Sequence, residues 1–377
     1  MIKSAEPVIV GVSDVSLGYG SPQMPTLLES LAEHYGARRA VAIEPDQSER
    51  PPVPARFPRL LLRRLPTIFH NFSHSGFVEY NLRASRLVNE LEPDVLVVSA
   101  CSVLPSVLKL RRRPRVTIYY MLEALDYYAG QPSWRSRFMI DLNRQAAKYV
   151  DLVIFPEENR AAIDLERGGL QRVPLAVCYN AVNRRKVAPP DDTRRRMRIL
   201  YSGTIHKILT SAEFYLHPDL QDIPIDMWGL IDGPQRDEIE AAMHRQGGQV
   251  RFRGCIDSLK LAEIRPTYAY SIVMWAPVDR NTYYACPNKL FEAIADGVPP
   301  IAAPHPQCRT ILERYQCGIL MDDWTFPSFH TALRRAKAIY GTAEYDRLVA
   351  NCRIAAEAEL NWDHQFDKIC RHLPTQV

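Results

Sequence analysis

The chain has 377 residues, of which 46% are hydrophobic and 24% are charged, and its formal net charge is +4. These are the proportions of a globular protein, so they exclude a disordered, collagen-like or coiled-coil chain. A net charge this small gives no support to nucleic-acid binding. The length predicts roughly two to three domains.

Apolar runs and cysteines indicate the compartment. The longest apolar runs, near 95–100 and 271–277, are shorter than the ~20 residues that a membrane-spanning helix needs. Residues 1–4 lead into a polar stretch rather than into the apolar core of a signal peptide. The eight cysteines are scattered and contain no C-x-x-C pair, which predicts free thiols and no zinc ribbon. We therefore expect a cytoplasmic protein without a transmembrane anchor.

Short apolar runs alternate with amphipathic helical stretches along the first half of the chain. Runs that are apolar on both faces and separated by helices are typical of a parallel sheet covered on both sides. Strands are predicted at 8–12, 39–43, 94–99, 116–120, 151–155 and 174–179, and helices at 24–35, 82–91, 134–149 and 159–167.

Residues 183–198 interrupt this alternation, because they are rich in arginine and contain two prolines and almost nothing apolar, which is the composition of a linker. The sequence therefore predicts two successive α/β domains of Rossmann-like type. Their parallel sheets would face a central cleft, with ligands at the carboxyl ends of the strands. After the linker, strands are predicted at 198–201, 225–228, 250–253, 271–274 and 300–303.

The segment 286–299, Cys-Pro-Asn-Lys-Leu-Phe-Glu-Ala-Ile-Ala-Asp-Gly-Val-Pro, predicts a helix and then a buried strand. Pro287 suits the first turn of a helix, and Gly297 suits its C-terminal end. Lys289 and Glu292 share a face near the helix N-terminus, where free N–H groups attract phosphate. Either Lys289 binds a phosphate and Glu292 accepts from a sugar diol, or the two form an exposed salt bridge worth about 0.3 kcal/mol.

The pattern P-x-K-x-x-E-A-x-A-x-G-x-P in this segment resembles the GT-B glycosyltransferases, most nearly the family 4-like group (glycosyl transferases group 1). Residues 199–207 are similar to the strand and glycine turn that meet the donor diphosphate, and 250–256 resemble the strand and turn that contact the base. Residues 179–182 look like the end of the N-terminal domain, and Asn361-Trp362 resembles the start of a tail that crosses back onto it. The resemblance covers nearly the whole chain.

The resemblance implies a fold, an activity and a set of site residues. The N-terminal acceptor-binding domain would be 1–183 with the tail 358–377, followed by a linker at 184–197 and a nucleotide-sugar-binding domain at 198–357. The enzyme would transfer a sugar from a nucleotide-diphosphate donor, with UDP or GDP expected, to a hydroxyl acceptor in polysaccharide, lipid-linked glycan or glycosylated-metabolite synthesis. The implied site residues are Gly203, Thr204, Lys207 and Lys289 for the diphosphate, with His206 and Arg253 as further candidates; Glu292, Arg253, Cys255 and Ile256 for the ribose and base; and Gly18, Tyr19, Gly20, Tyr284 and Asn288 for the donor sugar or acceptor.

Two positions depart from the family pattern. Tyr284 stands where relatives carry a glutamate that contacts the transferred sugar, so that contact would come from residues 281–283 instead. Leu122 replaces a histidine, whereas Glu123 remains and is the catalytic candidate. Glu123 would serve as the general base of an inverting enzyme if burial raised its pKa, or it would cap the following helix. These departures leave two alternatives, a nucleotide-sugar 2-epimerase of the same fold and a degenerate subunit that only binds sugar nucleotides.

Three further patterns bear on cofactors and partners. The turn 18–20 lacks the third glycine of a dinucleotide fingerprint, because Gln23 stands there, so NAD is not expected. No D-x-D motif ends a strand and the histidines do not cluster, so we expect no metal and no cofactor beyond the donor itself. The basic, amphipathic residues 56–69 predict a surface helix, or alternatively a peripheral contact with an anionic membrane.

Overall fold

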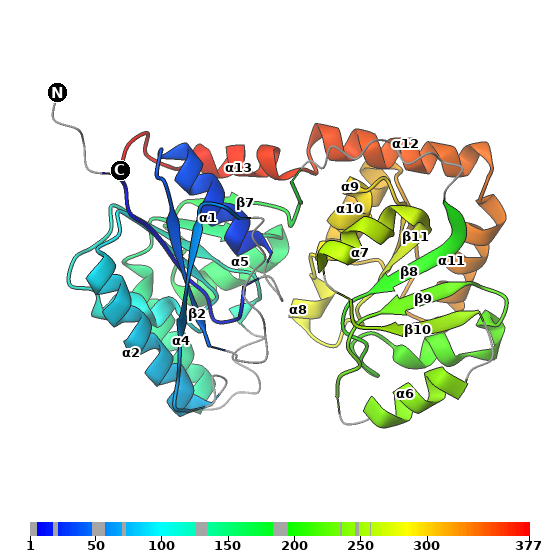
Figure 1. The fold of residues 1–377 in the computed structure, drawn as a ribbon, viewed down its shortest axis with the longest axis horizontal. Coiled ribbons are helices and arrows are strands. Elements are labelled where there is room, and N and C mark those ends of the chain that lie inside the picture. The colour runs from blue at the N-terminus through cyan, green and yellow to red at the C-terminus, as the bar shows by residue number, and fades with distance from the viewer. Residues whose placement is uncertain are drawn as a thin grey trace. The chain divides into compact units, whose positions relative to one another are not determined.

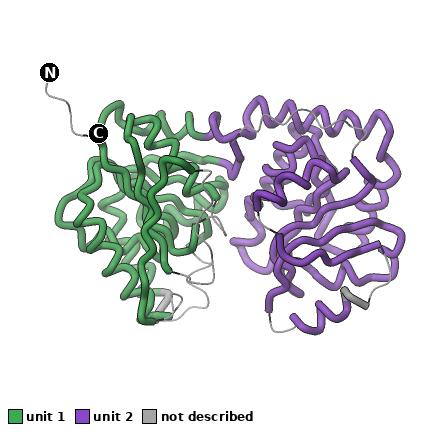
Figure 2. The backbone as a smooth tube through the Cα atoms, in the orientation of Figure 1, with its two compact units in different colours: residues 1–178, 366–377 green, residues 179–365 purple. Residues whose placement is uncertain are grey.

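The computed structural model describes residues 6–17, 22–46, 57–69, 73–125, 134–183, 195–233, 236–245, 249–256 and 258–377. Contacts divide the chain into two compact units, 1–178 together with 366–377, and 179–365 (Figure 2). We call them unit 1 and unit 2. The sequence predicts domain boundaries at 183 and 358 and a linker at 184–197. These boundaries remain a prediction.

Unit 1 is built on a seven-stranded parallel sheet with the order β3-β2-β1-β4-β5-β6-β7. Its central strands β1, β4, β5 and β6 are buried at every position, as their continuous apolar sequences predict. The strands are β1 (Ile9–Val12), β2 (Ala40–Pro45), β3 (Leu60–Leu65), β4 (Val95–Ser99), β5 (Val116–Tyr120), β6 (Leu152–Phe155) and β7 (Leu175–Val177); the helices are α1 (Gln23–His34), α2 (His74–Leu91), η1 (Leu104–Lys109), α4 (Trp134–Ala147) and α5 (Glu158–Gly168).

The helix predicted over residues 56–69 is wrong for the part that the structure describes. Leu60–Leu65 form the edge strand β3, and all six residues pair in parallel with β2. Pro58 and Pro66 leave too few residues between them for a helix that could satisfy its own hydrogen bonds. The same residues gain a full set of ladder hydrogen bonds along β2, so tertiary pairing decides the local structure.

Unit 2 is built on a six-stranded parallel sheet with the order β10-β9-β8-β11-β12-β13 (Figure 1). One face packs on a core that includes Tyr201, Met227, Ile272 and Phe329, and helix α9 packs Leu290 into a second cluster. The strands are β8 (Arg196–Ser202), β9 (Ile225–Trp228), β10 (Val250–Gly254), β11 (Tyr268–Val273), β12 (Pro300–Ala302) and β13 (Ile319–Leu320); the helices are η3 (Ala212–Leu216), η4 (Pro218–Leu220), α6 (Arg236–Arg245), α7 (Ser258–Ile264), η5 (Arg265–Thr267), α8 (Arg280–Tyr283), α9 (Asn288–Ala295), α10 (Pro306–Tyr315), α11 (Phe326–Ile339) and α12 (Ala343–Ala358).

The C-terminal tail belongs to unit 1 from Phe366 onward. Helix α13 (Trp362–Cys370) carries the Phe366 ring to a T-shaped contact with His34 of α1, at 6.0 Å between ring centroids. The Tyr35 hydroxyl donates to the carbonyl of Pro374 at 3.1 Å. The last residues of the chain therefore pack on its first helix. Within the described residues, no helix combines the length and the apolar character needed to cross a bilayer.

Candidate functional site

Three neighbouring strands of unit 2 end in glycines at the carboxyl edge of the sheet. Gly203 follows β8 and donates its N–H to Trp228 O at 2.9 Å, while Gly229 follows β9 and donates to the carbonyl of Gly254 at 2.9 Å. A Cβ on Gly229 would lie 1.7 Å from the carbonyl oxygen of Gly203, so only glycine fits. We call this edge the glycine floor, because these three residues contribute backbone and no side chains to it, so that a ligand can approach the backbone closely.

Lys289 places its ammonium directly over this floor. Its Nζ lies 4.5 Å from the ring centroid of Tyr201 and 5.6 Å from that of Trp275, and a Cβ on Gly203 would be 3.1 Å from it. The Nζ atom is buried and has no hydrogen-bond partner among the described residues. Pro287 is the N-cap of α9 rather than a residue of its first turn, so Lys289 is the second residue of the helix. The ammonium thus adds to the positive N-terminus of α9.

The electrostatics of Lys289 favour an anionic ligand. Burial lowers the pKa of Lys289 to about 8, although the nearby Glu292 carboxylate raises it. An ammonium without a hydrogen-bond acceptor is costly to bury, and contact with two aromatic rings offsets only part of that cost. A phosphate oxygen at this position would supply the missing acceptor.

Glu292 is held by a buried arginine that the sequence analysis did not identify. Arg265 Nη2 lies 2.7 Å from Glu292 Oε2, and its Nη1 lies 2.6 Å from Asp296 Oδ2. The exposed Lys289–Glu292 salt bridge considered above is therefore not formed. Burial lowers the pKa of Arg265, but the two carboxylates raise it more, so the guanidinium stays charged. The Glu292 side chain keeps a fixed position with 25% of its surface exposed.

Replacing Arg265 by glutamine should lower the free energy of unfolding by about 3 kcal/mol, because the nearly buried Asp296 would lose its countercharge. Chemical denaturation measures this loss. Arg309→Gln is the control, since it breaks only the exposed helical pair with Glu313, worth about 0.5 kcal/mol. Equal losses in the two variants would mean that Arg265 has no special structural role.

The loop after β8 carries the other predicted diphosphate ligands. His206 Nδ1 accepts the N–H groups of Ile208 at 3.1 Å and Leu209 at 3.2 Å, so this imidazole shapes the loop. Lys207 is half-buried, and Thr204 is exposed next to Gly203. The structure thus brings Gly203 and Lys289 together and places Thr204 and Lys207 in the adjoining loop.

The residues predicted for the base lie near the end of β10 and directly after it: Arg253 is within the strand, and Cys255 and Ile256 follow it. Arg253 Nε lies 2.9 Å from Asp226 Oδ1, which also accepts from Arg198 Nη1 at 2.8 Å. This guanidinium is therefore tied to the face of the sheet. Cys255 is exposed and Ile256 half-buried, and they follow Gly254 at the glycine floor.

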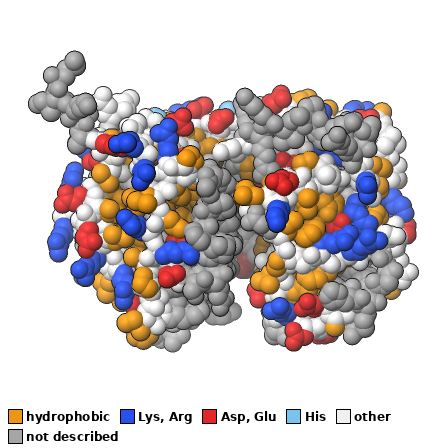
Figure 3. All heavy atoms as spheres, viewed as in Figure 1, with side chains coloured by type: hydrophobic (Ala, Val, Ile, Leu, Met, Phe, Trp, Pro, Cys, Tyr) orange, Lys and Arg blue, Asp and Glu red, His pale blue; other side chains and the backbone are white. Residues whose placement is uncertain are grey.

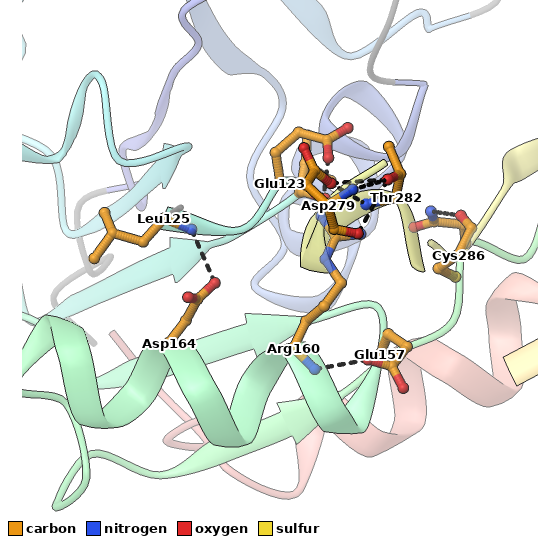
Figure 4. A network of polar contacts seen from close by, with 10 residues as sticks. Glu123, Leu125, Glu157, Arg160, Asp164, Asp279, Thr282 and Cys286 are labelled. Carbon is orange, nitrogen blue, oxygen red and sulfur yellow. Dashed lines mark hydrogen bonds and ion pairs between the residues drawn. The ribbon is translucent and has the colours of Figure 1, made fainter. Parts of the chain in front are cut away.

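The residues predicted for the donor sugar lie before and within α9. The short helix α8 is fixed by a capping box, in which the Thr282 N–H donates to Asp279 Oδ1 at 2.7 Å (Figure 4). Tyr284 ends α8 and Asn288 begins α9, and both are half-buried. Tyr283 is 39% exposed. Gly18, Tyr19 and Gly20 lie outside the described residues.

Glu123 lies in unit 1, after the carboxyl end of β5. Its Oε2 accepts from Arg160 Nη2 at 2.9 Å, and the same nitrogen donates to Leu122 O at 3.0 Å (Figure 4). Arg160 is buried, whereas the Glu123 side chain is 44% exposed. The structure thus gives Glu123 a fixed position but not the burial that the sequence argument required of a general base.

Asp164 anchors the segment that carries Glu123. Its Oδ2 accepts the Leu125 N–H at 2.9 Å, and burial raises the pKa of Asp164 to about 6 (Figure 4). The folded state then binds the proton more tightly than the unfolded state, so stability falls as pH rises from about 4 to about 6.

Asp164→Asn should raise the free energy of unfolding at pH 7 by about 1 kcal/mol and remove this pH dependence. Chemical denaturation at about pH 4 and at pH 7 measures both effects. The exposed Asp141→Asn is the control, and a destabilised Asp164→Asn would contradict the prediction.

Within the described residues, no three His, Cys, Asp or Glu side chains lie together as a metal site would require.

Neither a protein-family model nor a curated protein matches this chain. Several solved structures are similar to it over nearly their whole length. A sucrose-phosphate synthase from Thermosynechococcus elongatus is similar with a TM-score of 0.74 at 18% identity, over 97% of this chain and 98% of that chain. The glycosyltransferase WaaG, involved in lipopolysaccharide biosynthesis, gives 0.69 at 11% identity over 96% and 98%. HepE from Anabaena, in complex with UDP and glucose, gives 0.68 at 14% identity over 97% and 99%.

The chain has the GT-B fold. Both parallel sheets that the sequence predicts are confirmed, and so is the resemblance to proteins of this fold. At these identities the likeness shows the fold, and the activity has to be argued from the residues of the site.

Proposed function

We propose that this protein is a glycosyltransferase that moves a sugar from a nucleotide-diphosphate donor to a hydroxyl acceptor, in polysaccharide, lipid-linked glycan or glycosylated-metabolite synthesis. The observation that carries the proposal is the buried Lys289 ammonium, which lacks a hydrogen-bond partner among the described residues and lies over the glycine floor. HepE, which shares the fold, was solved with UDP and with UDP-glucose. We carry those ligands over to this chain as the expected donor class.

The proposal gives each residue a role. The diphosphate binds over Gly203 and Thr204, with Lys289, Lys207 and the N-terminus of α9 balancing its charge. Glu292, held by Arg265, accepts from the ribose hydroxyls. Arg253, Cys255 and Ile256 border the base. Tyr284 and Asn288 adjoin the sugar or the acceptor.

In the transfer, the acceptor oxygen forms a bond to the anomeric carbon while the bond from that carbon to the diphosphate oxygen breaks. The electron pair leaves with the diphosphate, where Lys289 and Lys207 stabilise the developing charge. The proton of the acceptor hydroxyl has to pass to a base. We assign this role to Glu123 because it follows the carboxyl end of β5 and is held in place by Arg160, although its side chain is 44% exposed rather than buried.

A thermal-shift panel tests the donor site. UDP, GDP, CMP, dTDP and ADP are compared, free and sugar-linked. One nucleotide diphosphate, at about 100 times its dissociation constant, should add about 2.7 kcal/mol to the free energy of unfolding. No stabilisation by any nucleotide would refute the proposal.

Product analysis then separates the catalytic alternatives. With the stabilising sugar nucleotide, slow donor hydrolysis or transfer that disappears in Glu123→Gln supports a transferase. A product epimerised at C2 in acceptor-free solution would identify an epimerase instead. Binding without any turnover would identify a subunit that only binds sugar nucleotides.

A further inference from the structure

One face of the unit 2 sheet gathers arginines around the buried carboxylate of Asp226 on β9. The Asp226 side chain is 4% exposed, and its Oδ1 lies 2.8 Å from Arg198 Nη1 on β8 and 2.9 Å from Arg253 Nε on β10. This carboxylate therefore holds two guanidinium groups in place, one on each neighbouring strand.

Two further arginines point to the same face, because side chains two residues apart on a strand lie on the same side of the sheet. Arg196 and Arg251 each stand two residues before the arginines that Asp226 holds. The intervening Met197 and Phe252 pack against the core on the other side of the sheet. We call the four residues Arg196, Arg198, Arg251 and Arg253 the arginine face.

The arginine face is open to solvent. On this side of the sheet, helix α9 covers β11 and β12, where Leu290 packs with Val273 and Ala302. On β8 and β10, by contrast, Arg196 and Arg251 are exposed. Figure 3 shows basic side chains gathered on the part of unit 2 where Figure 1 draws β8, β9 and β10.

The arginine face carries an excess of positive charge. Asp226 contributes one negative charge against four guanidinium groups. Arg196 and Arg251 form no ion pair with any residue that the structure describes. Positive charges held on neighbouring strands repel one another, and an anion bound between them would remove this repulsion. The arginine face therefore favours an anionic ligand.

The spacing of the arginines favours a polymer over a small anion. Residues two apart on one strand are separated by about 6.6 Å, and β8 and β10, with β9 between them, are about 9.6 Å apart. One phosphate or carboxylate group cannot contact guanidinium groups on both strands at these distances. A chain that carries anionic groups at regular intervals can contact several of them at once.

The surroundings of the arginine face favour one class of polyanion. Single-stranded nucleic acid binds by stacking its bases on exposed aromatic rings, but Trp228 and Tyr268 are not exposed, and the Trp228 Nε1 donates to the Tyr268 hydroxyl at 3.0 Å. The exposed residues of β8, β9 and β10 are all arginines, so these strands offer no apolar side chain to a bilayer. Guanidinium groups bind carboxylates in a bidentate manner, which suits a chain of acidic sugars.

We propose that the arginine face binds an acidic polysaccharide whose sugars carry carboxylates at regular intervals. The choice of a glycan over an acidic peptide rests on the proposed function, in which the protein acts in glycan synthesis. The binding itself uses guanidinium groups on the face of the sheet and does not need Lys289 or the glycine floor.

Fluorescence anisotropy of labelled polygalacturonate with the full chain tests the proposal. The wild type should bind polygalacturonate, more weakly at about 300 mM than at about 50 mM salt, and should not bind neutral dextran. Arg196→Gln/Arg251→Gln should weaken binding by about tenfold, because two exposed ionic contacts are lost. This variant should keep the wild-type melting temperature and nucleotide-induced shift, which verifies that it is folded.

Arg38→Gln/Arg39→Gln is the matched control, because it removes two positive charges from exposed residues of unit 1. It should bind polygalacturonate as the wild type does. Three results would overturn the proposal: no polygalacturonate binding by the wild type, an equal loss in the control, or tighter binding of polyglutamate or single-stranded DNA at the same salt concentration. Polygalacturonate binding without stabilisation by any nucleotide would support the arginine face and refute the proposed function instead.

Discussion

Replacing Lys289 by methionine should weaken binding of the nucleotide diphosphate by about 100-fold, because the ligand would lose its buried cationic partner. The same change should raise the free energy of unfolding of the ligand-free protein by about 1 kcal/mol. Methionine fills a similar volume between the Tyr201 and Trp275 rings without a buried charge to desolvate. Weaker nucleotide binding together with a higher free energy of unfolding would indicate that Lys289 serves the ligand and not the stability of the fold.

The pH dependence follows from the lowered pKa of Lys289. The pKa of Lys289 is about 8 in the folded protein and has the ordinary lysine value of 10.5 in the unfolded chain, so the unfolded state holds the proton more tightly. The cost of burying the charge is fully present below pH 8 and disappears as pH rises toward 10.5, so stability attributable to this group rises across that window. Nucleotide affinity should do the opposite, falling above about pH 8 as the ammonium loses its proton.

Calorimetric titration and denaturation at pH 7 and pH 9 measure both effects. Lys109→Met is the control, because it removes an exposed lysine of unit 1. It should change neither affinity nor the pH dependence. A Lys289→Met variant that still binds the nucleotide as the wild type does would remove the main support for the proposed site.

Buried parallel strands were the most predictable part of the fold. The strands expected at 116–120 and 225–228 are observed with the same bounds, because a strand covered on both faces is a continuous apolar run. The edge strand β3 was mistaken for a helix, since its mixture of leucines and arginines lacks that signal. Its structure depends on pairing with β2, which the local sequence does not reveal.

The sequence predicted those residues of the candidate site that lie close together in one segment of the chain. The segment 286–299 placed Lys289 and Glu292 on α9 correctly. It did not reveal Arg265, because this partner of Glu292 comes from η5 and only the fold brings it near. Nor did this segment reveal that Lys289 is buried. Its burial depends on Tyr201, near the end of β8, and on Trp275, which follows β11. Contacts between residues that are far apart in the chain cannot be read from this single sequence.

Gly229 illustrates a signal that was present in the sequence and not used, since it directly follows the predicted strand at 225–228. Gly229→Ala should lower the free energy of unfolding by about 4 kcal/mol, because the new Cβ would lie 1.7 Å from the carbonyl oxygen of Gly203 and neither backbone can move without breaking the strand ends. Denaturation measures the loss, and nucleotide titration should show that any folded fraction binds weakly.

Gly341→Ala separates this clash from the cost of the backbone conformation alone. Gly341 has φ +76 with nothing within 4 Å of an added Cβ, so its replacement should cost only about 1 kcal/mol. If the two variants lost equal stability, the close approach of Gly229 to Gly203 would not be what shapes the floor. A much larger loss in Gly229→Ala would mean that the floor beneath Lys289 is set by backbone contact between β8 and β9, and that the proposed diphosphate site depends on it.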